Sequence, residues 1–353
     1  MNVTTRCGLT LGKFAPLHKG HQFLIETALG EVDRLIVLIY DAPETTVPLS
    51  IRADWLRNLY PDIEVIEVWD GPNVVGASPE ITRMHDEHIV SLVGDRNITH
   101  FYSSEFYGDH VSRALGAVDR RVDEARRVVP ISGTELRSDP YGGRGYLAPA
   151  VYRDLIARIV FLGAPSTGKS TLATRAAELF ETVHVPEYGR DYWDAHQIER
   201  RLSADQLVEI AIGHRIIEEK VMLEANRFLF VDTDATTTAN FARHYHGSVD
   251  PRLMLLAEAT RDRYDLFILC GDDIPYDVTW DRSGEVDRRI MQRRTRSDLI
   301  ARRIPFVELR GSLDERLGIL KGLLHDFDRF RPLGDHLVRV GSEEKGVSIP
   351  SKS

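Results

Sequence analysis

Cysteine is scarce in this 353-residue sequence, and long apolar runs are missing. Cys7 and Cys270 both lie in or beside apolar, strand-like runs, which favours two buried thiols over a disulfide. No segment reaches the run of about 18 apolar residues that a membrane-spanning helix needs. Residues 1–7 also lack the basic start and apolar core of a secretory signal. We therefore expect a cytoplasmic protein with no membrane partner.

Net positive charge is also missing, because the formal net charge is -9. Nucleic-acid binding without sequence preference depends on Lys and Arg that neutralise phosphates, so we expect no nucleic-acid partner. An acidic protein can still focus positive charge in one phosphate-binding cleft. With 42% hydrophobic and 28% charged residues, the chain is typical of a globular protein and long enough for two domains. The composition leaves the oligomeric state open, and a homo-oligomer is compatible with it.

Short apolar runs alternate with longer amphipathic stretches along the whole chain. Runs of strand length separated by helical segments are typical of parallel βαβ units covered by helices on both faces. We therefore predict an α/β fold of two doubly wound parallel-sheet domains. The expected strands are residues 7–11, 35–40, 63–68, 98–102, 127–131, 159–162, 183–186, 228–231, 266–270 and 306–309.

A domain boundary is expected near residues 139–157, where turn formers precede a short connecting helix at 147–157. This predicts a first domain over residues 1–150 and a second over 151–335. Residues 336–353 are polar and contain Gly, Ser and Pro, so we expect a disordered tail. A capping box at Ser203 and Gln206 predicts the start of a helix in the second domain.

A glycine-rich phosphate motif, GAPSTGKS, occupies residues 163–170. It follows an apolar run and precedes a helix-forming stretch at 171–179, the context in which a loop turns backbone N–H groups toward phosphate. We expect Lys169 to reach the β- and γ-phosphates of ATP and Ser170 to bind Mg²⁺. The expected nucleotide-binding residues are Gly163, Ser166, Thr167, Gly168, Lys169, Ser170 and Thr171.

Two carboxylates end the apolar run at residues 228–231. Asp232 or Asp234 is expected to face the metal ion and its waters, which is the usual task of an acidic residue at this position. The alternative is that the aspartates only cap the next helix, expected at residues 236–241.

A further polar cluster, Glu187-Tyr-Gly-Arg190, follows the expected strand at 183–186. The carboxyl end of a strand is where an open α/β sheet binds its substrate. Glu187 is our candidate for accepting the proton of an attacking hydroxyl, and Arg190 for holding the transferred phosphoryl group. A salt-bridged loop without function is the alternative.

Arginine is concentrated in residues 281–303. A mobile arginine-bearing lid neutralises phosphate charge in small-molecule kinases, and Arg282 is the strongest candidate for such a residue here. Arg288 or Arg289 is a second candidate. A solvated helix explains most of the remaining arginines.

The N-terminal half contains a second phosphate motif, GKFAPLHKGH, at residues 12–21. His18 and His21 share one face of a starting helix, where two imidazole donors can stabilise charge on a triphosphate attacked at its α-phosphorus. Metal ligation and a filled core are the alternatives. The expected nucleotide-binding residues of this motif are Gly12, Lys13, Phe14 and Gly20.

A complementary segment, PISGTELR, lies far downstream at residues 130–137. Ser132 or Thr134 can cap a helix whose N-terminus meets phosphate, and Arg137 supplies a cation on the first turn. A helix cap with no ligand would look similar. Pairing with the histidine motif favours the functional interpretation.

Taken together, these motifs resemble a known family. Residues 12–21 with 131–137 are similar to the HxGH/ISTxxR nucleotidyltransferases. With residues 163–170 behind them, the order resembles the NadR-type bifunctional enzymes, which join a nicotinamide-nucleotide adenylyltransferase to a ribosylnicotinamide kinase. The likeness covers most of residues 5–325.

Two departures from the family pattern stand out. Gly133 replaces a Ser found in many such transferases, which removes a hydroxyl but leaves the backbone donor. No helix-turn-helix precedes the first expected strand, so the repressor role of some family members is not expected.

The resemblance implies two consecutive reactions of NAD synthesis. The kinase would phosphorylate nicotinamide riboside with ATP, and the transferase would join the resulting mononucleotide (NMN) to AMP with release of pyrophosphate. Both steps would use ATP and Mg²⁺. Candidates for stacking on the bases are Trp69, Tyr107, Tyr188, Trp193 and Trp280.

Two other functions remain open from the sequence. One is a phosphopantetheine adenylyltransferase fused to a dephospho-CoA kinase, which shares both phosphate motifs. The other is a nucleotide sensor with one inactive site.

Overall fold

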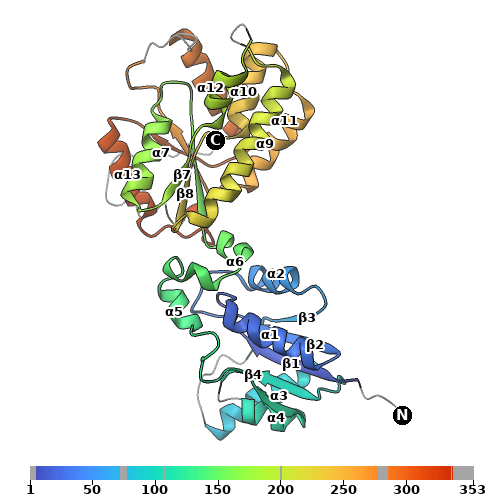
Figure 1. The fold of residues 1–353 in the computed structure, drawn as a ribbon. Coiled ribbons are helices and arrows are strands. Elements are labelled where there is room, and N and C mark those ends of the chain that lie inside the picture. Colours follow the sequence, from blue (N-terminus) through green and yellow to red (C-terminus); the bar gives the residue numbers. More distant parts are fainter. Residues whose placement is uncertain are drawn as a thin grey trace. The chain divides into compact units, whose positions relative to one another are not determined.

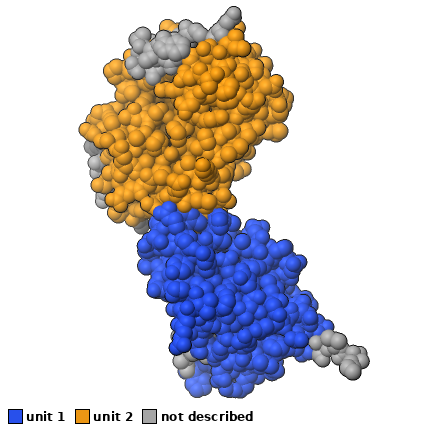
Figure 2. All heavy atoms as spheres, in the orientation of Figure 1, with its two compact units in different colours: residues 1–152 blue, residues 153–353 orange. Residues whose placement is uncertain are grey.

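The structure is a computed structural model that describes residues 5–71, 78–105, 108–198, 201–276, 285–334 and 336. The chain divides into two compact units, residues 1–152 and residues 153–353, coloured separately in Figure 2. We call them unit 1 and unit 2. Among the described residues, no helix has both the length and the apolar character that crossing a bilayer requires.

Unit 1 contains a parallel five-stranded sheet in the order β3-β2-β1-β4-β5. Figure 1 shows helices α1 and α2 on one face, and α3 and α4 pack on the other. The strands are β1 (Cys7–Gly12), β2 (Arg34–Tyr40), β3 (Glu64–Val68), β4 (His100–Ser103) and β5 (Val118–Arg121). The helices are α1 (Lys19–Glu31), α2 (Leu49–Leu59), α3 (Pro79–Val93), α4 (Gly108–Leu115), α5 (Gly133–Ser138) and the 3-10 turn η1 (Gly142–Tyr146); α6 (Pro149–Asp154) follows.

The predicted strand at residues 127–131 is wrong, and β5 lies earlier in the chain. The Asp123 carboxylate accepts hydrogen bonds from the backbone N–H groups of Arg127, Val128 and Val129, at 2.7–3.2 Å. These donors are therefore engaged in a turn and do not join a sheet ladder. The real edge strand, Val118–Arg121, is mostly exposed and carries polar residues, so it gives no apolar signal.

Unit 2 contains a second parallel sheet, in the order β10-β9-β6-β8-β7. Helices α7 and α13 cover one face, and α9, α10 and α11 lie on the other (Figure 1). The strands are β6 (Ala157–Leu162), β7 (Val183–Val185), β8 (Phe228–Asp232), β9 (Leu266–Cys270) and β10 (Val307–Leu309). The helices are α7 (Lys169–Leu179), α8 (Tyr188–His196), α9 (Ala204–Val221), α10 (Ala235–His246), α11 (Pro251–Glu258), α12 (Glu285–Ala301) and α13 (Leu313–His325), with 3-10 turns η2 (Met222–Glu224) and η3 (Ala259–Asp262).

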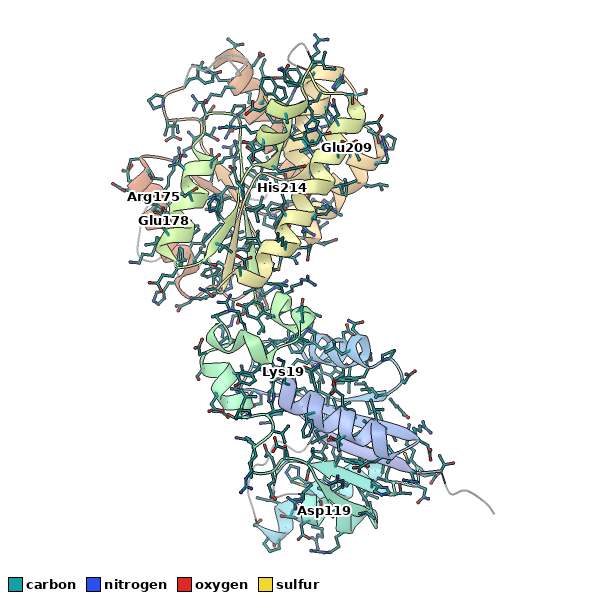
Figure 3. All side chains as sticks on the ribbon, in the orientation of Figure 1. Lys19, Asp119, Arg175, Glu178, Glu209 and His214 are labelled. Atoms are coloured by element: carbon teal, nitrogen blue, oxygen red, sulfur yellow. The ribbon has the colours of Figure 1, made fainter. Side chains whose placement is uncertain are left out.

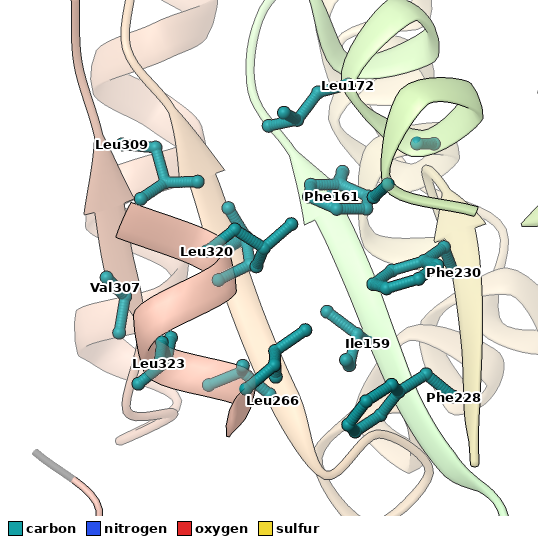
Figure 4. Packing of buried hydrophobic residues seen from close by; sticks show 14 of the residues in the cluster. Ile159, Phe161, Leu172, Phe228, Phe230, Leu266, Val307, Leu309, Leu320 and Leu323 are labelled. Carbon is teal, nitrogen blue, oxygen red and sulfur yellow. The ribbon is translucent and has the colours of Figure 1, made fainter. Parts of the chain in front are cut away.

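The core of unit 2 lies between the sheet and the α7/α13 face. Phe161, Phe230 and Leu320 are each fully buried there, as Figure 4 shows. The outer side of α7 is polar, and its Arg175 and Glu178 form an ion pair at 2.7 Å, visible in Figure 3. Helix α7 is thus amphipathic, with one face buried against the sheet and the other in solvent, as the amphipathic stretches of the sequence indicate.

Several local predictions are confirmed. Ser203 and Gln206 form a reciprocal capping box at the start of α9, with hydrogen bonds of 2.8 and 3.2 Å. Both cysteines are free and buried. The two parallel-sheet α/β units confirm the predicted fold class. The expected tail falls outside the described residues except for residue 336.

Candidate active sites

The phosphate motif of unit 2 forms the turn between β6 and α7. Gly163 and Gly168 have φ angles of 143° and 80°, which strain any residue with a side chain. Lys169 is 8% exposed, and its ammonium group donates a 2.9 Å hydrogen bond to the Ala164 carbonyl of the same loop. The loop is therefore folded around its own lysine at the start of a helix, where anions bind.

A cavity of about 440 Å³ opens beside this loop. It is also lined by aromatic and apolar side chains of α8, α9 and α10, including Trp193, Ile210 and Phe241. A phosphate cradle and apolar side chains thus line one cavity, which suits a ligand with a phosphate group and an apolar part. The lining brings together these residues expected from the sequence: Gly163, Ser166, Thr167, Gly168, Lys169, Ser170, Thr171, Glu187, Arg190, Trp193 and Asp234.

Some lining residues were missed by the sequence analysis. Arg201, His214 and Tyr245 also face the cavity. His214 lies in the middle of α9 (Figure 3), where its spacing is the same as that of core positions. No local motif marks these positions, since Arg201 precedes α9, His214 lies on α9 and Tyr245 on α10, and only tertiary packing brings them to one cavity.

Asp232 ends β8 beside the strand that leads into the phosphate loop. It pairs in register with Phe161, is 1% exposed, and neither of its carboxylate oxygens has a hydrogen-bond partner among the described residues. Burial raises the pKa of Asp232 to about 6; the charge of Glu187 adds to this rise, while Lys169 and the Ser170 hydroxyl oppose it. Two orphaned carboxylate oxygens and a nearby hydroxyl are oxygen ligands of the kind that Mg²⁺ prefers.

Asp234 is placed differently, because it caps α10. Its Oδ1 accepts hydrogen bonds from the backbone N–H groups of Thr236 and Thr237 at 3.0 and 3.1 Å, and from the Thr236 hydroxyl at 2.6 Å. This is the capping alternative weighed from the sequence. Its Oδ2 has no hydrogen-bond partner among the described residues, so only this oxygen is left for a metal role.

Glu187 and Arg190 lie together at the start of α8. The Arg190 guanidinium and the Glu187 carboxylate are 3.7 Å apart, and the Arg190 side chain is 52% exposed. Both residues line the cavity. Glu187 and Arg190 therefore form the salt bridge that a loop without function would have. They also face the cavity, as roles in phosphoryl transfer require.

The arginine-rich segment is only partly described. Arg282 and Trp280 lie outside the described residues, as does Tyr107 in unit 1. Arg288 is 4% exposed and donates a 2.9 Å hydrogen bond to the Ile274 carbonyl, so it supports the loop that lines the cavity. Arg289 is exposed on α12.

In unit 1 the histidine motif forms the N-terminus of α1. His18 caps the helix, and its Nδ1 accepts a 3.1 Å hydrogen bond from the Gly20 N–H. The proton of the neutral ring is therefore on Nε2, which is a donor. The two rings of His18 and His21 stack with centroids 3.8 Å apart. Burial lowers the pKa of His18 to about 4, with the charges of Arg126 and Arg137 adding to the shift.

The two distant motifs of unit 1 meet at this helix. Ser132 caps α5 in a capping box with Glu135. Arg137 donates a 2.9 Å hydrogen bond to the Ala15 carbonyl and a 3.1 Å bond to the Thr134 hydroxyl. A Cβ atom at Gly133 would lie 3.2 Å from the Arg137 guanidinium and 3.8 Å from His18 Nε2. Gly133 therefore lies between the imidazole and the cation.

The other residues expected in this motif differ in their exposure. Phe14 is 3% exposed with a φ of 45°, and its ring meets His21 edge-on at 4.9 Å, so its side chain belongs to the core. Lys13 forms an ion pair with Glu44. Gly12 ends β1, and Gly20 packs against the His18 ring.

One cation of unit 1 was not singled out from the sequence. Arg126 is exposed with a φ of 50°, and its charge lowers the pKa of His18, His21 and Glu135. It thus lies close to both phosphate motifs. Trp69, a candidate for stacking, follows β3 directly and is 62% exposed.

Fold and site together define two enzyme classes on one chain: a nucleotidyltransferase of the HxGH type in unit 1 and a P-loop phosphotransferase in unit 2. Comparison with known families agrees with this division. The family described as "Cytidylyltransferase-like" matches residues 9–139, and the family described as "AAA domain" matches residues 158–316.

Similar proteins identify the family more narrowly. The trifunctional NAD biosynthesis/regulator protein NadR of Salmonella typhimurium is 30% identical in an alignment that covers 86% of this chain and 78% of that protein. The Escherichia coli protein of the same name is 30% identical over 81% of this chain and 74% of its own. The chain therefore belongs to the NadR family.

A solved structure supports the fold. A NadR protein crystallised in complex with NAD and AMP-PNP covers 99% of both chains at 21% identity, with a TM-score of 0.52. At that identity the likeness concerns the fold alone. The identity to the two relatives confirms the family resemblance predicted from the sequence.

Proposed function

We propose that this protein performs two consecutive steps of NAD synthesis. Unit 2 phosphorylates the 5′-hydroxyl of nicotinamide riboside with ATP, and unit 1 transfers AMP from a second ATP to the NMN so formed. The names of the family members, and the NAD and AMP-PNP held by a solved NadR protein, support this choice of substrates. Two buried free thiols also suit a cytoplasmic enzyme.

In unit 2, positioning and charge stabilisation carry the phosphoryl transfer. Backbone N–H groups of the loop and the Lys169 ammonium bind the ATP phosphates. Ser170 and Asp232 are the residues that would hold Mg²⁺, which when bound neutralises charge on the β- and γ-phosphates. Glu187 accepts the proton of the riboside hydroxyl, and Arg190 stabilises the transferred group.

In unit 1, the neutral imidazoles act as hydrogen-bond donors. His18 presents Nε2–H to the triphosphate, and Arg137 supplies the charge that balances the leaving pyrophosphate. The N-termini of α1 and α5 add backbone donors at the same place. NMN then attacks the α-phosphorus directly, and no covalent enzyme intermediate is needed.

The observation that carries the proposal is that the described residues of both phosphate motifs come together on one chain of this family. His18 and Arg137 meet in unit 1 through the Ala15–His18 segment, and Lys169 and Ser170 face one cavity in unit 2. The presence of His18 and Arg137 in unit 1, and of Lys169 and Ser170 in unit 2, argues against a sensor with one inactive half. The membership of the NadR family argues against the coenzyme A fusion.

The direct test is an assay of purified protein with ATP, Mg²⁺ and nicotinamide riboside that follows both NMN and NAD. NMN should appear first and NAD second. Dephospho-CoA and phosphopantetheine serve as rival substrates in parallel reactions. Turnover of either rival without turnover of the nicotinamide substrates would overturn the proposal.

A further inference from the structure

A buried arginine lies directly behind the phosphate loop of unit 2. Arg316, on α13, is 2% exposed and donates to three backbone carbonyls: Thr167 at 2.8 Å, Gly311 at 3.0 Å and Gly271 at 3.2 Å. Its charge is balanced by Asp273 at 3.0 Å. One guanidinium group thus connects the phosphate loop to the segments that follow β9 and β10.

The contact with Thr167 has a consequence for the next peptide N–H. Across a planar trans peptide, the carbonyl of one residue and the N–H of the next point in opposite directions. Because Arg316 holds the Thr167 carbonyl, the Gly168 N–H points away from Arg316. Gly168 lines the cavity beside the phosphate loop, which is where an N–H group turned away from Arg316 can meet a phosphate.

Unit 1 contains the same arrangement at its own phosphate loop. Arg52, on α2, is 0% exposed and donates to the Lys13 carbonyl, to the Tyr40 carbonyl at 2.9 Å and to the Val47 carbonyl at 3.0 Å. Asp41 balances its charge at 3.3 Å. By the same planar geometry, holding the Lys13 carbonyl turns the Phe14 N–H to the other side of the loop.

We propose that Arg52 and Arg316 are positioning residues, each of which fixes the backbone of one phosphate loop in its nucleotide-binding orientation. Neither touches substrate. Each acts through one peptide group, and five guanidinium donors in a rigid fork suit this task better than a single ammonium group does. The proposal concerns the loops themselves and rests on the proposed function only for the choice of assay.

The test uses Arg316→Lys and Arg52→Lys in the full chain, which keep the charge but lose the fork. Arg316→Lys should raise the KM for ATP of the kinase about tenfold, equal to about 1.4 kcal/mol of binding. The KM of the kinase for nicotinamide riboside, and the KM values of the transferase for ATP and NMN, should change less than twofold. Arg52→Lys should show the mirror pattern, with the transferase affected and the kinase unchanged.

Arg329→Lys is the matched control. Arg329 also donates to backbone carbonyls, those of Asp154 and Ile156 at 2.9 and 3.1 Å, but it does so at the start of β6, at the opposite end from the phosphate loop. It should lower thermal stability without changing any KM for ATP. An unchanged KM in folded Arg316→Lys, or an equal rise in Arg329→Lys, would overturn the proposal.

Two further measurements keep the outcomes distinct. Calorimetric titration with a non-hydrolysable ATP analogue should show two sites in the natural protein and, in each variant, one of the two weakened about tenfold, whatever the second substrate is. If nicotinamide riboside is not turned over but one site is still weakened in this way, the proposed function fails and this inference stands. If Arg316→Lys does not fold, Asp273→Asn replaces it, with an expected rise of about threefold in the same KM; no rise would refute the role.

Discussion

Two histidines begin one helix in unit 1, and their surroundings keep both imidazoles neutral. The pKa of His18 falls to about 4, and that of His21 is also well below its ordinary value, mainly because the surrounding protein shields both rings from water. Neutral rings suit a role as hydrogen-bond donors, since their tautomer is fixed by the backbone. They also make the stability of unit 1 depend on pH.

Stability falls as the pH is lowered, because the unfolded state then binds a proton that the folded state does not. Between about pH 6.5 and pH 4 an unfolded His18 is protonated while the folded one is not, so lowering the pH stabilises the unfolded state. We predict that unit 1 loses about 2 kcal/mol of stability through His18 between pH 7 and pH 5. Hydrogen exchange of peptides from residues 19–31 measures this loss, and His18→Gln should show a smaller one. An equal loss in the variant would contradict the assignment.

Burial disfavours the charged form of Asp232 as well, but the dependence of stability on pH is the opposite of that for His18. Its pKa of about 6 lies above the ordinary value, so the folded state loses stability as pH rises from about 4 to 6 and stays less stable at pH 7. We predict that Asp232→Asn raises the stability of unit 2 by up to about 3 kcal/mol at pH 7 without Mg²⁺, and lowers kinase turnover at least about 100-fold. Thermal unfolding and the kinase assay measure the two effects. A destabilised variant would show that the carboxylate has a partner that stabilises it.

The strand orders of the two sheets differ by the exchange of two neighbouring strands. In unit 1 the second strand, β2, lies beside the first, whereas in unit 2 the third strand, β8, takes that place. The exchange brings the end of β8 next to the phosphate loop, because β6 and β8 pair in register through Phe161 and Asp232. The sheet order therefore decides which unit has a carboxylate at its phosphate site.

Helix α13 connects the core of unit 2 to its phosphate loop through different side chains. Leu320 is fully buried against the sheet, and Arg316 reaches the loop. We predict that Leu320→Ala lowers the stability of unit 2 by about 3 kcal/mol while the KM for ATP is kept, since the cavity that it leaves lies in the core. Leu255→Ala, at a site 67% exposed, should change stability by less than about 0.5 kcal/mol. Urea unfolding followed by kinase assays distinguishes the two.

Much of the fold could be predicted from the sequence where the signal is local. The phosphate loop and the capping box at Ser203 depend on residues within a few positions of one another. The edge strand β5 could not be found, because an exposed strand needs no apolar run. Arg52 and Arg316 also gave no signal, since their carbonyl partners Lys13 and Thr167 lie 39 and 149 positions away in the chain.

At the scale of the whole molecule, two sites on one chain allow a test by complementation. We predict that His18→Gln makes NMN but no NAD, and that Lys169→Ala makes NAD from NMN but not from nicotinamide riboside, each loss being at least about 100-fold. A mixture of the two variants should convert nicotinamide riboside to NAD after a lag, while free NMN accumulates. Loss of both activities in one variant would show that the units are not independent.

The hydrogen bond between Lys169 and the Ala164 carbonyl also affects the conformational entropy lost when ATP binds. In most flexible lysines the four-carbon stem loses its rotational freedom when the ligand arrives. Here the stem is already buried and its ammonium group already has an acceptor, the Ala164 carbonyl. When ATP binds, the Lys169 ammonium group therefore exchanges one acceptor for another. The conformational entropy of the side chain has already been lost on folding and does not weaken ATP binding.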